Sequence, residues 1–308
     1  MTLGRRLKDV LAGRAMLATT LFSTGLVGII ALGLYMRARP LLERQPISKL
    51  LLGETWLPSE GQFGMKPFII GTVWVTVVAV VVAVPLCFLT SIFLAEYAPK
   101  KVRAIAKPLI DLLAGIPSVV YGVWGLLVVV PFVADKLGPF AVSHLKHIPY
   151  IATEYSAGYS VLAAGLVLAI MVFPVIISVS NEVLRAVPND YRETALGLGA
   201  TRYETIRKVV VKKALPGLLA AVVLGVSRAL GETMAVLMVA GNVPVAPKSV
   251  FDAGYPLPAL IANNYGEMMS IPLYDSALLL AAFVLFVVVI IFNVLSRYVL
   301  TKVKRRIA

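Results

Sequence analysis

Residues 68–94 read FIIGTVWVTVVAVVVAVPLCFLTSIFL, a run without a single Asp, Glu, Lys or Arg. About 20 mostly apolar residues suffice for a helix to cross the hydrocarbon core of a bilayer. Five further segments qualify, and none shows the alternating pattern of a membrane β-barrel. The six predicted spans cover residues 16–36, 68–94, 112–133, 159–180, 215–240 and 277–299. We therefore predict an all-α integral membrane protein with six transmembrane helices.

The composition of the whole chain agrees with a lipid environment. Of the 308 residues, 59% are hydrophobic and 15% are charged, whereas soluble proteins have about 45–50% and about 25%. The first apolar run follows basic residues, as in a signal peptide, but it is longer than the roughly 7–15 apolar residues of a signal sequence. We expect it to remain as an uncleaved span.

The positive charge predicts the orientation of the spans. The N-terminal segment, the loops after the second and fourth spans, and the C-terminal tail together hold 20 of the 29 Lys and Arg residues. Such clusters between apolar runs mark cytoplasmic loops. The net charge of +13 therefore indicates membrane topology rather than a nucleic-acid partner. Both termini are predicted to be cytoplasmic.

The sequence offers no constellation for catalysis, metal or cofactor binding. Cys87 lies inside an apolar run and has no second cysteine to pair with. His144 and His147 have no carboxylate or cysteine at the spacing of metal ligands. The Gly-x-x-x-x-Gly-Lys-Ser/Thr loop that cradles ATP phosphates is absent. We expect no enzymatic activity and no cofactor, and any coupling to ATP must come from another polypeptide.

The third predicted span is interrupted by Gly115, Pro117 and Gly122. Proline removes a backbone donor and bends a helix. Backbone groups freed at membrane depth are tolerated where protein or a water-filled cavity covers them. The bend is either a packing kink or a hinge that lines a transport pathway.

The loop after the fourth span, residues 186–214, is predicted to form two short helices. Asn189 and Asp190 favour a helix start, and Gly199 is a suitable left-handed stop. Thr201 and Glu204 have the spacing of a capping box for the second helix. Because the flanking spans hold this loop against the bilayer, docking onto a cytoplasmic partner is favoured over DNA binding.

Residues 193–199, ETALGLG, resemble the EAA loop (Glu-Ala-Ala-x-x-x-Gly) of ABC importer permeases. Thr194 and Lys212 depart from the family pattern. The resemblance implies a type I, MetI-like permease fold and a loop that inserts into an ATPase subunit. The residues implied for coupling are Asp190, Glu193, Ala195, Gly199, Thr201, Arg202 and Glu204.

The fifth predicted span contains two charges, Arg228 and Glu232, in the stretch SRALGETMAV. A charge at the centre of a span costs about 2.5–3.5 kcal/mol on insertion scales, so two require a reason. Four residues apart on one helix, they could pair with each other. Alternatively, Arg228 presents its planar donor fork to an oxyanion in the pathway. Glu232 would then accept the proton of hydrogen phosphate, which sulfate lacks at neutral pH.

This stretch and residues 63–72 and 112–125 resemble permease subunits of phosphate ABC importers, of the PstC type, over most of the chain. The resemblance implies a phosphate site at Arg228 and Glu232, with Ser227 and Thr233 beside them. It implies a prokaryotic inner membrane and four kinds of partner: phosphate itself, a sister permease, two ATPase subunits and an external phosphate-binding protein. Residues 37–67, 139–157 and 243–275 would receive the binding protein.

The resemblance also suggests a division of the chain. Residues 1–67 form the N-terminal segment, first span and external loop, 68–300 the permease domain, and 301–308 a basic tail. Two other functions remain open at this point. One is a permease for another oxyanion such as sulfate or molybdate, and the other is a carrier or channel that uses no ATP.

Overall fold

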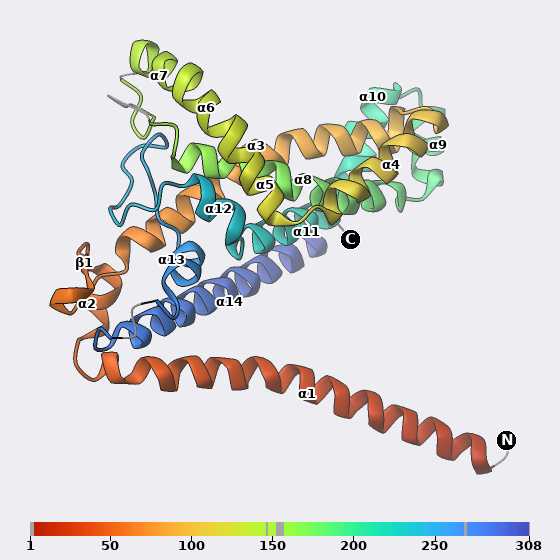
Figure 1. The fold of residues 1–308 in the computed structure, drawn as a ribbon. Helices are drawn as coiled ribbons and strands as arrows, with labels where there is room; N and C mark the ends of the chain where they lie inside the picture. Colours follow the sequence, from red (N-terminus) through yellow and green to blue (C-terminus); the bar gives the residue numbers. More distant parts are fainter. Residues whose placement is uncertain (1–2, 146, 152–156, 268–269, 308) are drawn as a thin grey trace.

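The computed structural model describes residues 3–145, 147–151, 157–267 and 270–307, and of residues 3–8, 306 and 307 only the backbone. Within this part, six helices are long and apolar enough to cross a membrane (Figure 1). They are Asp9–Leu42, Lys66–Tyr97, Ser118–His144, Val161–Arg185, Arg202–Leu230 and Tyr274–Arg305. The prediction of six helical spans is confirmed.

The elements run in the following order along the chain. The helices are α1 (Leu3–Leu42), α2 (Ile47–Leu52), α3 (Lys66–Ile92), α4 (Lys100–Gly115), α5 (Ser118–Trp124), α6 (Val130–Phe132), α7 (Gly138–His144), α8 (Val161–Arg185), α9 (Asn189–Gly197), α10 (Arg202–Glu204), α11 (Val211–Leu230), α12 (Met234–Val239), α13 (Leu257–Asn264) and α14 (Tyr274–Ile307). Wider π-helical turns at Phe93–Tyr97, Gly125–Val129, Val133–Leu137 and Thr205–Val210 extend several of them. Strands β1 (Trp56–Leu57) and β2 (Gln62–Phe63) form a small antiparallel hairpin.

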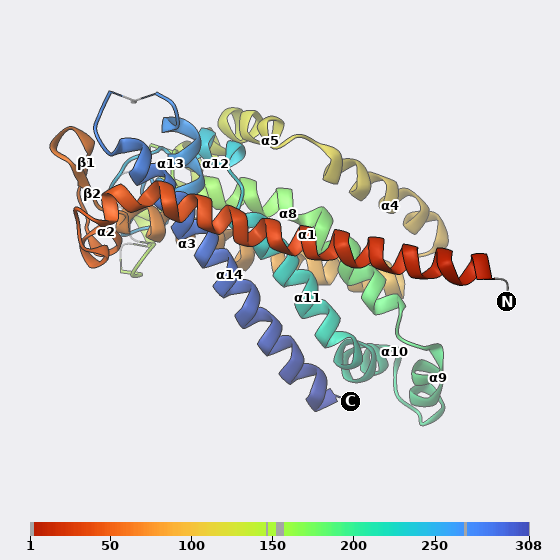
Figure 2. The ribbon, with the colours of Figure 1, turned by 90° about the horizontal axis from the view of Figure 1, so that it is seen from below.

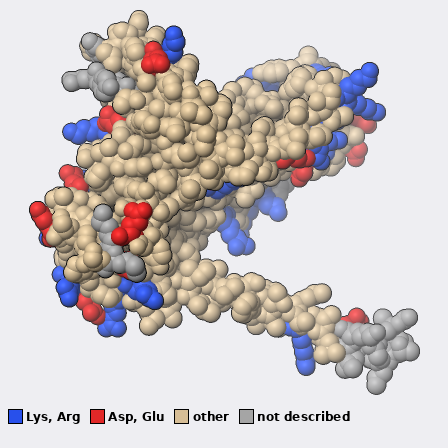
Figure 3. Space-filling model, viewed as in Figure 1, with Lys and Arg blue, Asp and Glu red and all other residues tan. Residues whose placement is uncertain are grey.

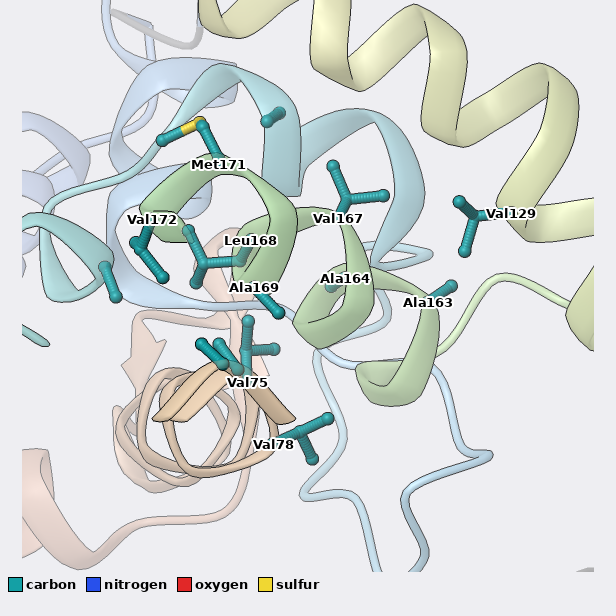
Figure 4. Close-up of a cluster of buried hydrophobic side chains, with 14 of the residues drawn as sticks. Val75, Val78, Val129, Ala163, Ala164, Val167, Leu168, Ala169, Met171 and Val172 are labelled. Carbon is teal, nitrogen blue, oxygen red and sulfur yellow. The ribbon is translucent and has the colours of Figure 1, made fainter. Parts of the chain in front are cut away.

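The centre of the bundle is helix α8, which packs along α3 and against α11 and α12. Gly165 allows the close approach to α3, because a Cβ at this position would lie 2.4 Å from a methyl carbon of Val78. Figure 4 shows Val75 and Val78 of α3 facing the α8 side chains around Leu168. The core is thus built from small and branched residues that let two apolar helices approach closely.

Helix α1 leaves the bundle over most of its length (Figure 1), and in the view from below it passes in front of the bundle (Figure 2). Near its end it contacts α14, where the rings of Tyr35 and Phe283 lie 6.0 Å apart and Ala38 is buried. The apolar side chains before that point, such as Phe22 and Ile29, are exposed. A helix with this surface requires lipid or another apolar protein around it.

Two predicted spans have wrong bounds. Helix α4 ends at Gly115 and a new helix begins at Ser118, so the predicted span 112–133 is broken. The cause is Pro117, which disfavours helical geometry at Ile116 (φ −69°, ψ 129°). The predicted span 215–240 is also two helices, since α11 ends at Leu230 and α12 starts at Met234.

The two ends of the molecule differ. The start of α1, the end of α14 and helices α9 and α10 lie at one end, and α2, β1 and α7 lie toward the other (Figure 1). Figure 3 shows Lys and Arg gathered around the α9 and α10 end, whereas acidic and basic residues mix at the other end. The arrangement agrees with the charge pattern of the sequence, and the direction of the termini across the membrane stays a prediction.

Candidate translocation site and coupling loop

Arg228 lies in the last turn of α11, and Glu232 lies in the break that follows it. The expectation that both residues occupy one face of a continuous helix is wrong, because the helix ends at Leu230. Glu232 instead points its Oε1 to the start of α12, where it accepts a hydrogen bond from the backbone N–H of Ala235 at 3.3 Å. Thr233 Oγ1 donates to the Gly231 carbonyl at 3.3 Å within the same break.

The Arg228 side chain is half-buried. Among the described residues, the Arg228 guanidinium forms no ion pair with Glu232 within 4.0 Å, and it donates no hydrogen bond. The mutual ion pair that the sequence left open is therefore absent. A cation withdrawn from water without a counter-charge is costly, so this group has a donor surface ready for an anionic ligand.

Ser227 connects the site to the last span. Its Oγ donates to Asn293 Oδ1 of α14 at 3.3 Å, and Asn293 Nδ2 donates to the Val289 carbonyl at 2.8 Å. Sequence reasoning missed Asn293. The available signal was an isolated amide within an otherwise apolar span, a residue type that forms hydrogen bonds between membrane helices.

The second half of the third span lies against the second half of the fifth. Helix α5 packs on α12, and a Cβ at Gly122 would lie 2.6 Å from Met238 Sδ. Tyr121, one residue earlier, lies near enough to Arg228 for the two to interact electrostatically. Its hydroxyl donates to the Leu113 carbonyl at 2.8 Å and so joins α5 to the end of α4.

Interrupted membrane helices form the substrate sites of many secondary transporters. Gly115 ends α4 with open space around its Cα, and Pro117 starts α5. Gly122 serves a tight helix contact rather than the break itself. Whether these residues act as a hinge stays a prediction.

The loop predicted to couple to an ATPase, residues 186–214 (the coupling loop), contains α9 as one short helix, as predicted. Its second helix is not separate, because it begins at Arg202 and continues into the fifth span as far as Leu230. Gly199 has φ +87° and follows α9. The Ala200 N–H bonds to the Ala195 carbonyl at 3.1 Å and the Gly199 N–H to the Leu196 carbonyl at 2.9 Å, which together form a Schellman motif. Thr201 and Glu204 form the capping box in both directions.

The start of α9 differs from the prediction. Pro188 occupies the N-cap position, and no side chain caps the first turn. Asn189 Oδ1 instead accepts a long hydrogen bond from Arg192 Nη1 at 3.5 Å. Proline's fixed φ pre-sets the chain for the helix entry, so the Asx cap is not required.

The residues predicted for coupling lie mostly on the surface of the loop. Asp190, Glu193, Gly199, Thr201 and Arg202 are exposed, Glu204 is half-exposed, and Ala195 is buried beneath them. Leu198 stands out with 84% of its surface exposed at the turn between α9 and α10.

Three arginines surround the end of the second span. Arg192 of α9 forms a bidentate pair with Glu96, through Nη2 to Oε1 at 2.6 Å and Nε to Oε2 at 3.3 Å. The two side chains are only 17% and 9% exposed. Arg202 donates to the Glu96 carbonyl and stacks over the Tyr97 ring at 4.9 Å.

Arg103 completes this arginine cluster from α4, donating to the Leu94 and Ala95 carbonyls at 3.0 and 3.1 Å. Sequence reasoning did not single out Glu96, Arg103 or Arg192. A carboxylate placed directly after an apolar span was the signal for Glu96, but its partner lies 96 residues away. The cluster ties the coupling loop rigidly to α3 and hence to the core of the bundle.

Comparison with known proteins identifies the family. Residues 87–305 match the family described as binding-protein-dependent transport system inner membrane component. The phosphate transport system permease protein PstC of Xylella fastidiosa (strain 9a5c) is 38% identical, with 98% of this chain and 95% of the relative aligned.

A probable PstC of Methanocaldococcus jannaschii is 33% identical over 94% of this chain and 92% of its own length. The inward-facing MetNI methionine ABC transporter shares the fold at a TM-score of 0.51 and 20% identity, covering 77% of this chain and 96% of the solved one. The six apolar helices, the interrupted spans and these matches show that the chain is a multi-pass permease that belongs to the family of binding-protein-dependent transport system inner membrane components.

Proposed function

We propose that this chain is the permease subunit of an ATP-driven phosphate importer and that phosphate passes at Arg228. One observation carries the proposal: the half-buried Arg228 guanidinium, which forms no ion pair or hydrogen bond with any described residue, lies at the break of the fifth span, whose second half packs on the third. Its planar fork matches two oxygens of a phosphate group. The relatives' names supply phosphate as the substrate class.

Glu232 supplies the discrimination between oxyanions. Its carboxylate would repel a fully deprotonated anion but accepts a hydrogen bond from the P–OH of hydrogen phosphate. Sulfate has no such proton at neutral pH, so it would leave the carboxylate unpaired, and such a mismatch is heavily penalised at a desolvated site. Ser227 and Thr233 hold the helix end and the break in place around the two charges.

The proposed complex contains a sister permease, two ATPase subunits and an external phosphate-binding protein. The exposed tip of the coupling loop, with Leu198 at its centre, would contact the ATPase. Segments at the opposite end, including α2, the β-hairpin and the loop before α13, would contact the binding protein. The coupling loop and both termini then face the cytoplasm, in agreement with the distribution of Lys and Arg.

Transport would proceed by alternating access. ATP-driven closure of the ATPases displaces the coupling loop, and the arginine cluster transmits this displacement to α3. The breaks at Ile116–Pro117 and Gly231–Thr233 allow the half-helices around Arg228 to open first to the outside and then to the inside. Gly115 and Pro117 supply flexibility at the first break, and Gly122 keeps α5 on α12.

Uptake by the complete complex in liposomes tests the proposal. Radiolabelled phosphate should accumulate only with ATP on the coupling-loop side and with the binding protein on the other. An excess of unlabelled sulfate or molybdate should not compete. Uptake without ATP would contradict the importer function, and uptake of sulfate at the rate of phosphate would contradict the substrate.

A further inference from the structure

Two adjoining pockets lie between α4 and the last turns of α8, beside the coupling loop. The wider one has a volume of about 860 Å³ and is open to the surface. The narrower one, of about 30 Å³, reaches inward to Asn181, and Glu182 also lines it. They share Arg103, Lys107, Asp111 and Arg185 in their walls, and together they form one site, the α4–α8 pocket.

The wider part of this pocket is strongly positive. Four cations and a single carboxylate line it, namely Lys100, Arg103, Lys107, Arg185 and Asp111. Within the described part of the chain, none of these five forms an ion pair within 4.0 Å. Cations that converge on a hollow concentrate anions there more than the same charges do on a flat surface.

Arg103 is held in position before any ligand arrives. Its Nε and Nη2 donate to carbonyls at the end of α3, at 3.0 and 3.1 Å, so the guanidinium cannot swing into solvent without breaking both bonds. In the described structure its Nη1 has no acceptor, which leaves donors for a ligand. A fixed guanidinium loses little conformational freedom when it binds an oxyanion.

The inner end of the pocket provides the complementary acceptor. Asn181 Oδ1 is buried and has no hydrogen-bond partner among the described residues. An unpaired buried oxygen costs about 1–3 kcal/mol unless a donor reaches it. A ligand that combines anionic oxygens with an O–H group satisfies both the cations and this amide oxygen.

We propose that the α4–α8 pocket binds a phosphate group, carried either by inorganic phosphate or by the head group of an anionic phospholipid. Ala104, Pro108 and Leu112 give the wider part an apolar wall suited to a glycerol or acyl segment. The break in the third span is also near, since about 12 Å of helix separates Lys107 from Gly115, where α4 ends. Inorganic phosphate bound here would occupy a second station toward the coupling-loop end of the path.

The test removes three charges from the pocket and three from elsewhere on the same face. The complete complex carries either Lys100→Gln, Lys107→Gln and Arg185→Gln or, as the matched control, Lys101→Gln, Lys302→Gln and Lys304→Gln. In one arm, native mass spectrometry counts phosphatidylglycerol retained from mixed phosphatidylcholine nanodiscs. In the other arm, the binding of radiolabelled phosphate is measured in pure phosphatidylcholine nanodiscs. Arg228→Ala is present in every variant of this arm to remove phosphate binding at the proposed Arg228 site.

We expect the pocket variant, and not the control, to lower binding roughly 100-fold in one arm, since each cation near an anionic surface contributes about a factor of five. Loss in the lipid arm assigns the site to a head group, and loss in the phosphate arm assigns it to the free ion. The proposal is overturned if neither ligand binds the parent complex or if both variants lose binding equally. Neither readout measures transport, so the comparison of the two variants does not depend on the transport function. Only the Arg228→Ala background of the phosphate arm rests on the proposed site.

Discussion

At the scale of single residues, the molecule contains one Arg and Glu that form an ion pair and another Arg and Glu that do not. Arg192 and Glu96 satisfy each other at 2.6 Å. Arg228 and Glu232, four residues apart, do not pair. The helix end at Leu230 is the reason, because it turns Glu232 toward the start of α12 and leaves the guanidinium with unused donors. A charged side chain without an opposite charge inside a membrane protein indicates a ligand-binding role rather than a structural ion pair.

Replacing Glu232 by Gln should relax the discrimination against sulfate. The amide keeps the size of the side chain and removes the charge that a proton-free anion would leave unpaired. We expect the ratio of phosphate to sulfate uptake to fall at least about tenfold. Asp9→Asn, at an exposed position near the start of α1, is the control. An unchanged ratio in Glu232→Gln would refute the role of the carboxylate.

Gly199 and Gly197 provide a matched pair for the turn of the coupling loop. Both have open space around the Cα, but only Gly199 has a positive φ, of +87°. Gly199→Ala should therefore destabilise the turn by about 1 kcal/mol through the backbone alone. Gly197→Ala should have no such cost. The measurement is the affinity of the permease for its ATPase in detergent. Equal affinities for the two variants would contradict the requirement for a left-handed backbone at Gly199.

At the scale of elements, the coupling loop is connected to α3 through the arginine cluster. Glu96 receives Arg192 through its side chain and Arg202 through its carbonyl, and Arg103 holds the preceding carbonyls. A displacement of α9 therefore acts on the end of α3, and α3 packs along α8 at the centre of the bundle. The loop and the core move as one body unless the Arg192–Glu96 pair opens.

Breaking the Arg192–Glu96 pair should uncouple ATP hydrolysis from transport. Because both side chains are mostly buried, we expect Glu96→Gln to lower the free energy of unfolding by about 2 kcal/mol, between the values for exposed and buried pairs. Phosphate moved per ATP hydrolysed should fall, while ATPase binding persists. Lys208→Gln, which opens the exposed pair with Glu204, should leave this ratio unchanged.

A double-mutant cycle with Arg192→Gln distinguishes a direct interaction from two separate effects. The loss in the double variant should be clearly smaller than the sum of the single losses. Additive losses would show that the two residues act independently.

Local patterns in the sequence predict the elements better than their breaks. Gly199 and the Thr201–Glu204 capping box depend on neighbouring residues, so their geometry could be predicted from spacing alone. The break after Leu230 could not, because Gly and Thr within a span are compatible with a continuous membrane helix. The Arg192–Glu96 and Ser227–Asn293 contacts join residues 96 and 66 positions apart, and no local pattern encodes them.

At the scale of the whole molecule, the isolated chain leaves apolar surface uncovered. Helix α1 carries exposed apolar side chains along most of its span, and α14 exposes Ile291, Val294 and Leu295. The two charged ends and the apolar belt between them match a protein that crosses a bilayer. The bundle is thus organised from one aqueous face to the other, with the Arg228 site between them.

Cysteine labelling tests the orientation of this arrangement. Cys87, the single native cysteine, is fully buried, and Cys87→Ala gives a background without thiols. Lys302→Cys lies at the coupling-loop end, and Leu52→Cys, at a position that is 70% exposed, lies at the other. A membrane-impermeant thiol reagent should label Leu52→Cys in intact spheroplasts and Lys302→Cys only in inverted vesicles. The reverse pattern would place the coupling loop outside.

Phosphate uptake by the complete complex carrying Arg228→Ala tests the central claim most directly. The initial rate should fall about 100-fold or more, as expected when a bidentate charged contact is lost, and Arg228→Lys should restore only part of it. Arg297→Ala, on the exposed surface of α14, should transport normally. If Arg228→Ala imports phosphate at the parental rate with ATPase bound, then phosphate does not pass at this guanidinium and the assigned site is wrong.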